Sequence, residues 1–226
     1  MQKYLVAVIS AVLLTVSAPP TWAADPALES EDDKTVYALG LILSRNLAPF
    51  ALSDSELDVL ISGVRDGVAG GDPKVELQTY GPKVQELAKA RQAKVAEAEK
   101  GKSKAFLAEQ AKTPGAKTTE SGLIYIEESA GSGESPKASD KVKVHYHGTL
   151  SDGTVFDSSV DRGEPATFPL NRVIPCWTEG VQMMKVGGKA RLVCPSDIAY
   201  GDRGSPPKIS PGAALVFEVE LIEIVK

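Results

Sequence analysis

The sequence predicts an α+β protein with an N-terminal helical segment, a long connecting helix and a C-terminal antiparallel sheet. Three observations lead to this fold class. Residues 33–112 repeat apolar side chains at helical spacing or consist of helix formers. From Gly122 onwards the pattern changes to alternation of apolar and polar residues, which is typical of strands. A single helix-like stretch, "PCWTEGVQMMKVGG", interrupts these strands, so we expect a twisted sheet wrapped on one short helix.

The first 23 residues have the layout of a secretory signal peptide. Lys3 precedes an uncharged apolar run, and small residues close the segment at Ala23 and Ala24. The apolar run is about 13 residues long, whereas a membrane span needs about 20. We therefore expect cleavage near Ala23 and a periplasmic protein, with outer-membrane association or secretion as alternatives.

Two short amphipathic helices are expected after this segment. The first carries the stripe Val36, Leu39, Leu43 and Leu47 and is expected to end at Pro49. The second begins at a capping box formed by Ser53 and Glu56. Its apolar stripe consists of Leu57, Leu60, Ile61, Val64 and Val68. Because the chain offers little to bury these stripes, we expect two copies to exchange helices in a homodimer.

A polar stretch rich in Ala, Lys, Glu and Gln follows and predicts one long helix. It extends from Pro82 to Lys112, or from near Lys74 with a kink at Gly81–Pro82. Its apolar residues are sparse, so we interpret it mainly as a solvated spacer. The expected organisation is residues 1–23 as signal peptide, 24–72 as helical dimerisation segment, 73–116 as connecting helix and 117–226 as a compact C-terminal domain.

Strands of the C-terminal part are predicted by alternation. In "KVKVHYHGTL", Val142, Val144 and Tyr146 share one face, while the lysines and histidines share the other. Asp152–Gly153 is a hairpin turn signal between this strand and the next. The last strand, "ALVFEVELIEIVK", alternates in the same way.

Composition and the remaining motifs exclude several classes. The formal net charge of −5 argues against a nucleic-acid partner. His145 and His147 share the lysine-bearing face and no third histidine exists, so no metal site is expected. Cys176 and Cys194 are the only cysteines of a chain that we expect to be exported. We favour a disulfide bond between them, and reactive-thiol chemistry is the alternative.

Several separate segments resemble one known family in order and spacing. They are "VHYHGTLSDGTVFDSS", "DRGEPATFPL", "RVIPCWTEGVQMMKVGGKARL", "PSDIAYGDRG" and "ALVFEVELI". Over about the last 105 residues the chain is similar to the FKBP-type peptidyl-prolyl cis-trans isomerases. The N-terminal organisation resembles that of the exported bacterial subgroup that includes macrophage infectivity potentiators. The resemblance implies the FKBP-like fold, isomerase activity without a cofactor, and macrolide inhibitors as ligands of the pocket.

Carried over to this sequence, the resemblance implies a pocket lined by aromatic rings, with Trp177 as its floor. Tyr200 would offer its hydroxyl to a substrate carbonyl, and Ile174 would offer a backbone N–H. Asp157 would lie at the pocket edge near Tyr146 and Arg162. The remaining residues implied as walls are Phe156, Phe168, Val173, Ile209 and Phe217.

These residue types suit the rotation of an X–Pro bond. No covalent bond breaks, so no nucleophile is needed, and an apolar bowl weakens the charge-separated resonance of the amide. We expect the protein to speed the folding of proline-containing, unfolded polypeptides of the cell envelope and to have chaperone activity. The alternative is a holdase chaperone that binds unfolded chains in a dimeric cleft without catalysis. Ala166 stands where an aromatic residue is common in the family, and Ser205-Pro206-Pro207 forms an unusual loop tip, so substrate preference is open.

Overall fold

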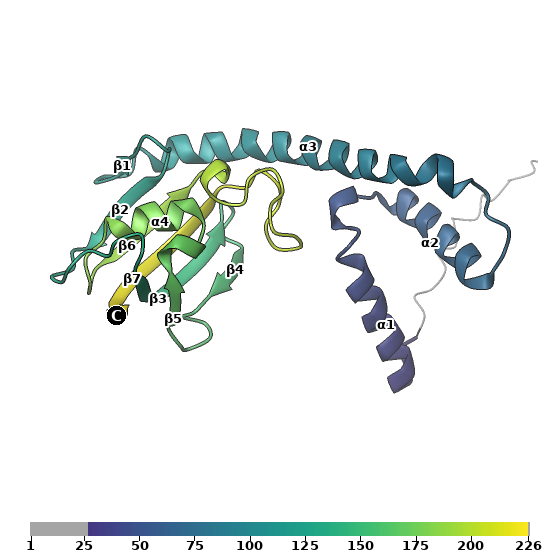
Figure 1. Ribbon diagram of the computed structural model, residues 1–226, viewed down its shortest axis with the longest axis horizontal. Coiled ribbons are helices and arrows are strands. Elements are labelled where there is room, and N and C mark those ends of the chain that lie inside the picture. The colour runs from purple at the N-terminus through teal and green to yellow at the C-terminus, as the bar shows by residue number, and fades with distance from the viewer. Residues whose placement is uncertain (1–26, 226) are drawn as a thin grey trace, which may run out of the picture. The chain divides into compact units, whose positions relative to one another are not determined.

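A computed structural model describes residues 27–225 of the chain (Figure 1). The expected signal peptide lies outside these described residues. The contacts divide the chain into two compact units, and the boundary between Leu41 and Ile42 falls within the first helix. Within residues 27–225, no helix is both long and apolar enough to cross a membrane.

Helix α1 spans Glu31–Ser44 and has no buried residue. Its start is capped by Ser30, whose Oγ accepts a hydrogen bond from Asp33 N at 3.0 Å. The helix ends earlier than the sequence predicted, and Pro49 instead lies in a short 3₁₀ turn, η1, at Ala48–Phe50. Proline fixes its own φ and restricts the residue before it, so it favours the start of a new turn over the end of a continuous helix.

Helix α2 spans Asp54–Ala69 and begins with the predicted capping box. The Ser53 side chain accepts from the Glu56 backbone, and the Glu56 carboxylate accepts from Ser53 N at 2.9 Å. The helix stops where Gly70 adopts φ +65°, a conformation that glycine reaches without steric cost. No residue of α2 is buried.

Helix α3 spans Leu77–Gln110 with Pro82 inside its second turn, so it starts five residues before the proline. Its N-terminal part agrees with the predicted solvated spacer, since Leu77, Tyr80 and Val84 are exposed. Its C-terminal part does not, because Ala96 and Ser103 are each only 3% exposed. The interpretation of the helix as mainly a spacer is therefore wrong for the end that precedes the sheet.

Ser103 joins this end of α3 to the sheet domain. Its Oγ accepts from Ala214 N at 2.9 Å and donates to Gly212 O at 3.1 Å. Gly212 has φ +79°, and a Cβ added there would lie 2.4 Å from Ala96 O. Only glycine permits so close an approach of the two backbones.

The sheet is antiparallel and has seven strands, in the order β1-β2-β6-β7-β3-β4, with β5 pairing to β3 (Figure 1). Helix α4, Pro175–Gln182, packs against β6 and is the predicted short helix. The 3₁₀ turns η2, Leu170–Arg172, and η3, Ser196–Ile198, complete the domain. The predicted fold class is confirmed. The strands are β1 Lys117–Thr118, β2 Ile124–Ser129, β3 Lys141–Leu150, β4 Val155–Ser158, β5 Ala166–Pro169, β6 Lys189–Cys194 and β7 Leu215–Val225.

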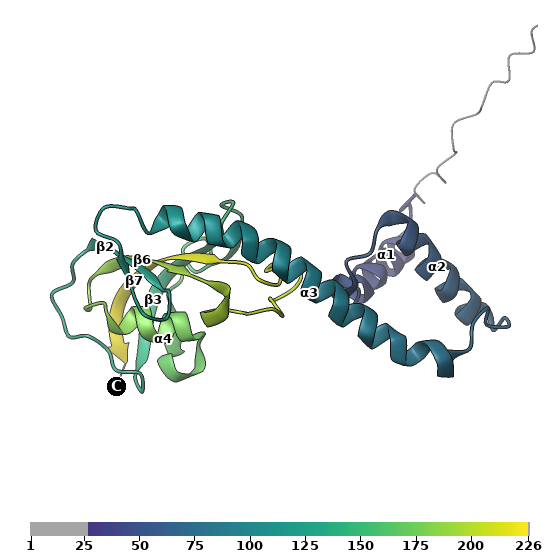
Figure 2. The same ribbon diagram turned by 90° about the horizontal axis from the view of Figure 1, so that it is seen from above.

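Most of the core lies between α4 and one face of the sheet. Alternation holds along β3, where Val142, Val144 and Tyr146 are buried. It fails at Val216 in β7, which is buried although its neighbours Leu215 and Phe217 point to the main core. Val216 belongs to a second, smaller cluster on the opposite face, which the end of α3 covers through Phe106 and Leu107 (Figure 2).

Candidate active site

An open cavity of about 440 Å³ lies beside the main core of the sheet domain. Its lining residues come from β3, β4, β5 and β7, from η2 and the start of α4, and from the turn that follows η3. This volume is within the range of small-ligand sites. The lining residues are Tyr146, Phe156, Asp157, Phe168, Arg172, Val173, Ile174, Trp177, Tyr200 and Phe217.

Aromatic rings meet edge to face around Trp177. Its ring centroid lies 5.3 Å from Tyr146, 5.3 Å from Phe217 and 5.7 Å from Phe168, with interplanar angles of 84° to 86°. Phe156 meets Phe217 in the same manner at 5.5 Å. Such T-shaped pairs stabilise one another beyond the burial of their area. The rings therefore support each other and leave the cavity open.

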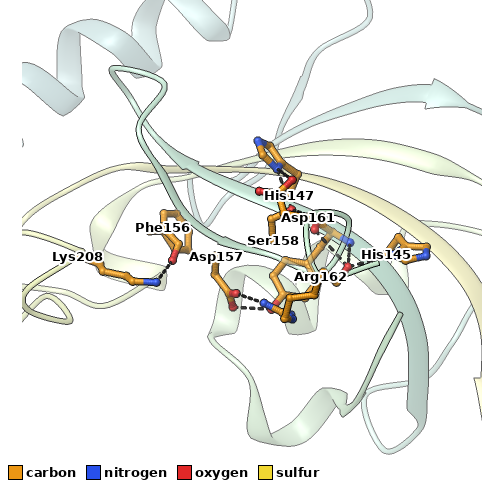
Figure 3. A network of polar contacts seen from close by, with 10 residues as sticks. His145, His147, Phe156, Asp157, Ser158, Asp161, Arg162 and Lys208 are labelled. Carbon is orange, nitrogen blue, oxygen red and sulfur yellow. Dashed lines mark hydrogen bonds and ion pairs between the residues drawn. The ribbon is translucent and has the colours of Figure 1, made fainter. Parts of the chain in front are cut away.

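A polar cluster forms one edge of the cavity (Figure 3). Tyr146 Oη donates to Asp157 Oδ2 at 2.5 Å, and Arg162 Nη2 donates to Tyr146 Oη at 2.9 Å. Arg162 Nη1 forms an ion pair with the Asp157 carboxylate. The three side chains thus fix each other at the mouth of an otherwise apolar site.

The cluster sets the protonation of its members. Partial burial alone would raise the pKa of Asp157, but hydrogen bonds from Tyr146 and Arg162 outweigh it and hold that pKa below its usual value. Burial raises the pKa of Tyr146, and its hydrogen bond to Asp157 adds to this effect. Around neutral pH, Asp157 is therefore a carboxylate and Tyr146 a neutral donor.

Local backbone structure explains how β3 and β4 present these groups. Gly148 pairs with Asp157 across the two strands, and a Cβ at Gly148 would lie 2.7 Å from the Phe156 ring. Glycine therefore makes room for that ring against the sheet. Past the end of β4, Ser159 Oγ accepts from Tyr146 N at 2.8 Å, which anchors the turn that carries Arg162.

Tyr200 and Ile174 line the cavity, and each carries a hydrogen-bond donor without a partner in the described part of the chain. The hydroxyl of Tyr200 has no hydrogen bond within residues 27–225, and this side chain is 40% exposed. The backbone N–H of Ile174, at the N-cap of α4, also makes none to any described residue. Both donors are available to a bound peptide.

Other site residues expected from the sequence lie close by. Ile209 is buried and lines an adjoining cavity, not the walls of the main one. Arg162 stands beside the cavity and acts on it through Tyr146 and Asp157. Arg172, which lines the cavity from η2, was not predicted from the sequence. Its position directly before Val173 was the available signal.

The two cysteines form a disulfide bond, with Cα atoms 5.9 Å apart. The bond ties the first turn of α4, next to Trp177, to the last residue of β6. Both residues are fully buried. With a sequence separation of 18 residues, such a closed loop contributes roughly 3 kcal/mol in the chain-entropy model.

The two histidines make separate local contacts on the outer face of β3 (Figure 3). His145 Nδ1 lies 3.1 Å from Ser159 Oγ, and His147 Nδ1 lies 3.0 Å from Ser158 Oγ. Among the described residues, no group of three or more His, Cys, Asp or Glu side chains is placed to hold a metal ion.

The arrangement combines a ring-lined apolar cavity with a few fixed polar groups at its edge. Nucleophile and base are not paired within it: the carboxylate of Asp157 is held by Tyr146 and Arg162. Such a site suits the binding of an apolar ring next to an amide and a conformational change of that amide.

Comparison with known proteins identifies the class. A family model described as FKBP-type peptidyl-prolyl cis-trans isomerase matches residues 132–222. A model of the domain amino terminal to FKBP-type peptidyl-prolyl isomerase matches residues 32–126. The chain belongs to the FKBP-type peptidyl-prolyl cis-trans isomerase family and is an enzyme of that class.

Within this family, the chain is similar to FkpA and MIP proteins of bacteria. It is 47% identical over 220 residues to FkpA of Aeromonas hydrophila, covering 92% of this chain and 81% of the relative. It is 36% identical over 227 residues to the outer membrane protein MIP of Legionella longbeachae, covering 96% and 97%. The crystal structure of FkpA from Escherichia coli matches with a TM-score of 0.64 at 40% identity and covers 88% of this chain and 98% of that one. The predicted family is confirmed.

Proposed function

We propose that X–Pro isomerisation takes place in the cavity of about 440 Å³ above Trp177. The observation that carries this assignment is an open, ring-lined hollow whose polar groups are either locked together or free to meet a peptide. Tyr146, Phe156, Phe168 and Phe217 would receive the proline ring.

An apolar cavity of this kind is sufficient to accelerate the rotation of an X–Pro bond. Rotation about an amide faces a barrier of about 18–20 kcal/mol because resonance keeps the bond planar. An apolar environment disfavours the polar planar form more than the twisted one, so the barrier falls. Each 1.36 kcal/mol removed increases the rate about tenfold.

The polar residues position the substrate in this proposal. Tyr200 Oη and the Ile174 N–H would donate to carbonyl groups of the peptide on either side of the proline. Asp157, held by Tyr146 and Arg162, would fix the electrostatic field at the twisting amide. No proton would be transferred.

Rates on a short X–Pro peptide test the assignment. We expect Asp157→Ala to lower kcat/KM at least tenfold, since a charge-assisted hydrogen-bond network is lost. Tyr200→Phe is expected to lower it about fivefold, as for one neutral hydrogen bond. Tyr80→Phe, the same change on an exposed ring of α3, is the control. Wild-type rates in both site variants would refute the assignment.

Clients and chaperone activity form a second part of the proposal. The substrates would be unfolded, proline-containing polypeptides, and the protein would also suppress aggregation. Binding of unfolded chains in a dimeric cleft, independent of catalysis, is the alternative explanation of that second activity. An aggregation assay with Asp157→Ala separates them: retained suppression alongside lost isomerisation would place the two activities in different parts of the chain.

The N-terminal helices support a homodimer. Large apolar side chains on each helix are exposed, among them Val36 and Leu39 of α1 and Val64 and Val68 of α2. Faces of this kind are costly to leave in water. We retain the division into residues 24–72 for dimerisation, 73–116 for connection and 117–226 for catalysis as part of this proposal.

A periplasmic location follows from residues 1–23, with outer-membrane association or secretion as alternatives. The disulfide bond supports an oxidising compartment. The Legionella longbeachae relative is named as an outer membrane protein. Mass spectrometry of the mature N-terminus from fractionated cells tests the location and the cleavage near Ala23.

Macrolide inhibitors of the FKBP family are the small ligands expected in this cavity. Its apolar rings with a few donors at the edge suit such a ligand. Competition between a macrolide and the X–Pro peptide checks this expectation, and non-competitive behaviour would contradict it.

A further inference from the structure

A second cavity adjoins the prolyl cavity. Its volume is about 630 Å³, and it shares Phe156, Asp157 and Tyr200 with the first. Its far wall is the loop of residues 205–209 together with Arg45, which follows α1. A peptide whose proline occupied the first cavity would pass its neighbouring residues directly into the second.

Lys208 brings a positive charge into this second cavity. Its Nζ donates to Phe156 O at 2.7 Å, which holds the loop against β4 (Figure 3). An ammonium group has three donors. The remaining donors of Lys208 have no carboxylate within ion-pair distance among residues 27–225.

Arg45 adds a second charge to the same cavity. Its guanidinium makes no hydrogen bond or ion pair with another residue in the part of the chain that the structure describes. Five donors in a planar fork suit a carboxylate better than any neutral partner. Arg172, which lines the prolyl cavity itself, is likewise without a described ionic partner.

Acidic side chains near these cations already have cationic partners. Asp157 forms its ion pair with Arg162. Asp197 and Asp202, which flank Tyr200 in the sequence, both face Lys100, with Nζ to Oδ1 distances of 3.4 Å and 2.6 Å. Lys100 balances only one of these two carboxylates, but the cations Arg45, Lys208 and Arg172, unpaired within residues 27–225, outnumber the one that is left. The mouth of the site is therefore locally positive, although the whole chain carries a net charge of −5.

We propose that the second cavity is a specificity site for an acidic side chain of the client polypeptide, placed a few residues from the isomerised proline. Lys208 and Arg45 bind the carboxylate, and the proline enters the adjoining ring-lined cavity. This inference rests on the proposed location of isomerisation. It identifies a substrate class, acidic proline-containing segments, for which no other feature of the site selects.

The expected preference for acidic peptides is small because Lys208 and Arg45 are exposed to solvent. Both cations are exposed, and an exposed ion pair adds only a modest free energy that salt screens. We expect about a two- to fivefold higher kcat/KM for an acidic peptide than for its neutral isostere at low ionic strength. Raising the salt concentration should reduce this ratio towards one.

The test uses the full-length protein and pairs of X–Pro peptides that differ only in Glu or Gln. The charged position is moved from one to four residues away from the proline, on each side in turn. In wild type the Glu member is expected to be faster at one or more positions. In Lys208→Met and Arg45→Met the ratio of the two rates falls towards one, since each methionine keeps an apolar stem without the charge.

Lys117→Met is the matched control. Lys117 is exposed on β1, at the opposite edge of the sheet from β4, and has no ionic partner within residues 27–225. It changes the net charge by the same amount and should leave the Glu-to-Gln ratio as in wild type. Because each ratio is taken within one variant, general loss of activity does not enter it.

The outcomes separate this proposal from the one on which it rests. Equal acceleration of Glu and Gln peptides at all positions, or a ratio unchanged in both cavity variants, would overturn the specificity site alone. A fall in the ratio for Lys117→Met equal to that for Lys208→Met would also overturn it, because the effect would then be one of net charge. No acceleration of either peptide would overturn the location of isomerisation as well.

Discussion

The sheet domain and the N-terminal helices bury their apolar residues in different ways. Leu192, Leu215 and Leu221 of the sheet are fully buried within one chain. Helices α1 and α2 contain no buried residue at all, although both carry apolar stripes. A single copy thus completes the core of the catalytic domain but leaves the helices without one. The stability of the helices should therefore depend on protein concentration, whereas that of the sheet domain should not.

The largest expected effect tests the self-sufficiency of the catalytic domain. Trp177→Ala removes the ring at the centre of three edge-to-face contacts. We expect a loss of about 3–5 kcal/mol in the free energy of unfolding and loss of isomerase activity. Denaturant unfolding of the catalytic domain measures this. The loss should be the same at low and high protein concentration, and a concentration-dependent loss would contradict the comparison.

A charge on α2 tests whether the N-terminal helices depend on a second copy of the chain. Val64→Glu places a carboxylate on the apolar stripe of α2 at a side chain that is 55% exposed in the single chain. We expect the dissociation constant of the dimer to rise at least tenfold, because burial of an apolar side chain of this size contributes about 1.5–3 kcal/mol. Sedimentation velocity over a range of concentrations measures it. Arg65→Glu on the same helix is the control, and equal effects of both changes would argue against the stripe as interface.

Ser103→Ala tests whether the C-terminal end of α3 belongs to the catalytic domain. The change leaves Ala214 N without its acceptor and Gly212 O without its donor, in a buried place. We expect a loss of about 1–3 kcal/mol in stability of the catalytic domain. Ser103→Thr keeps the hydroxyl and separates the hydrogen bonds from the packing. If Ser103→Ala leaves the unfolding midpoint unchanged, the end of α3 does not belong to the catalytic domain.

The smallest expected effect is a loss of stability in acid through the Glu56–Arg91 pair. Hydrogen bonds from Arg91 and from the Ser53 backbone lower the pKa of Glu56 to about 2 from 4.5. Since the folded pKa is the lower one, the stabilisation is present above about pH 4.5 and is lost as the pH falls towards 2. The thermal unfolding temperature of wild type relative to Glu56→Gln should fall over that window. A difference that stays constant from pH 6 to pH 2 would contradict the role of the Glu56–Arg91 pair.

Much of the candidate site could be predicted from the sequence because its residues lie in segments that resemble one family in order and spacing. The turn signal at Asp152–Gly153 predicted the hairpin, and alternation gave the face of Tyr146. The family resemblance implied that Asp157 lies near Tyr146. Arg172 escaped prediction because its exposure to the cavity depends on the 3₁₀ turn before α4. The charges at Arg45 and Lys208 come together only through the fold, since 163 positions of sequence separate them and no periodicity links them.

Local periodicity and residue types in fixed order were enough to predict the fold class, the capping box of α2 and the family. Tertiary structure alone decided that α3 ends as part of the catalytic domain. The reason is physical: Ala96 and Ser103 are small, and they contribute by letting α3 come close to the backbone at Gly212 and Ala214. A scale of hydrophobicity gives such residues little weight, and only the opposing backbone shows what they pack against.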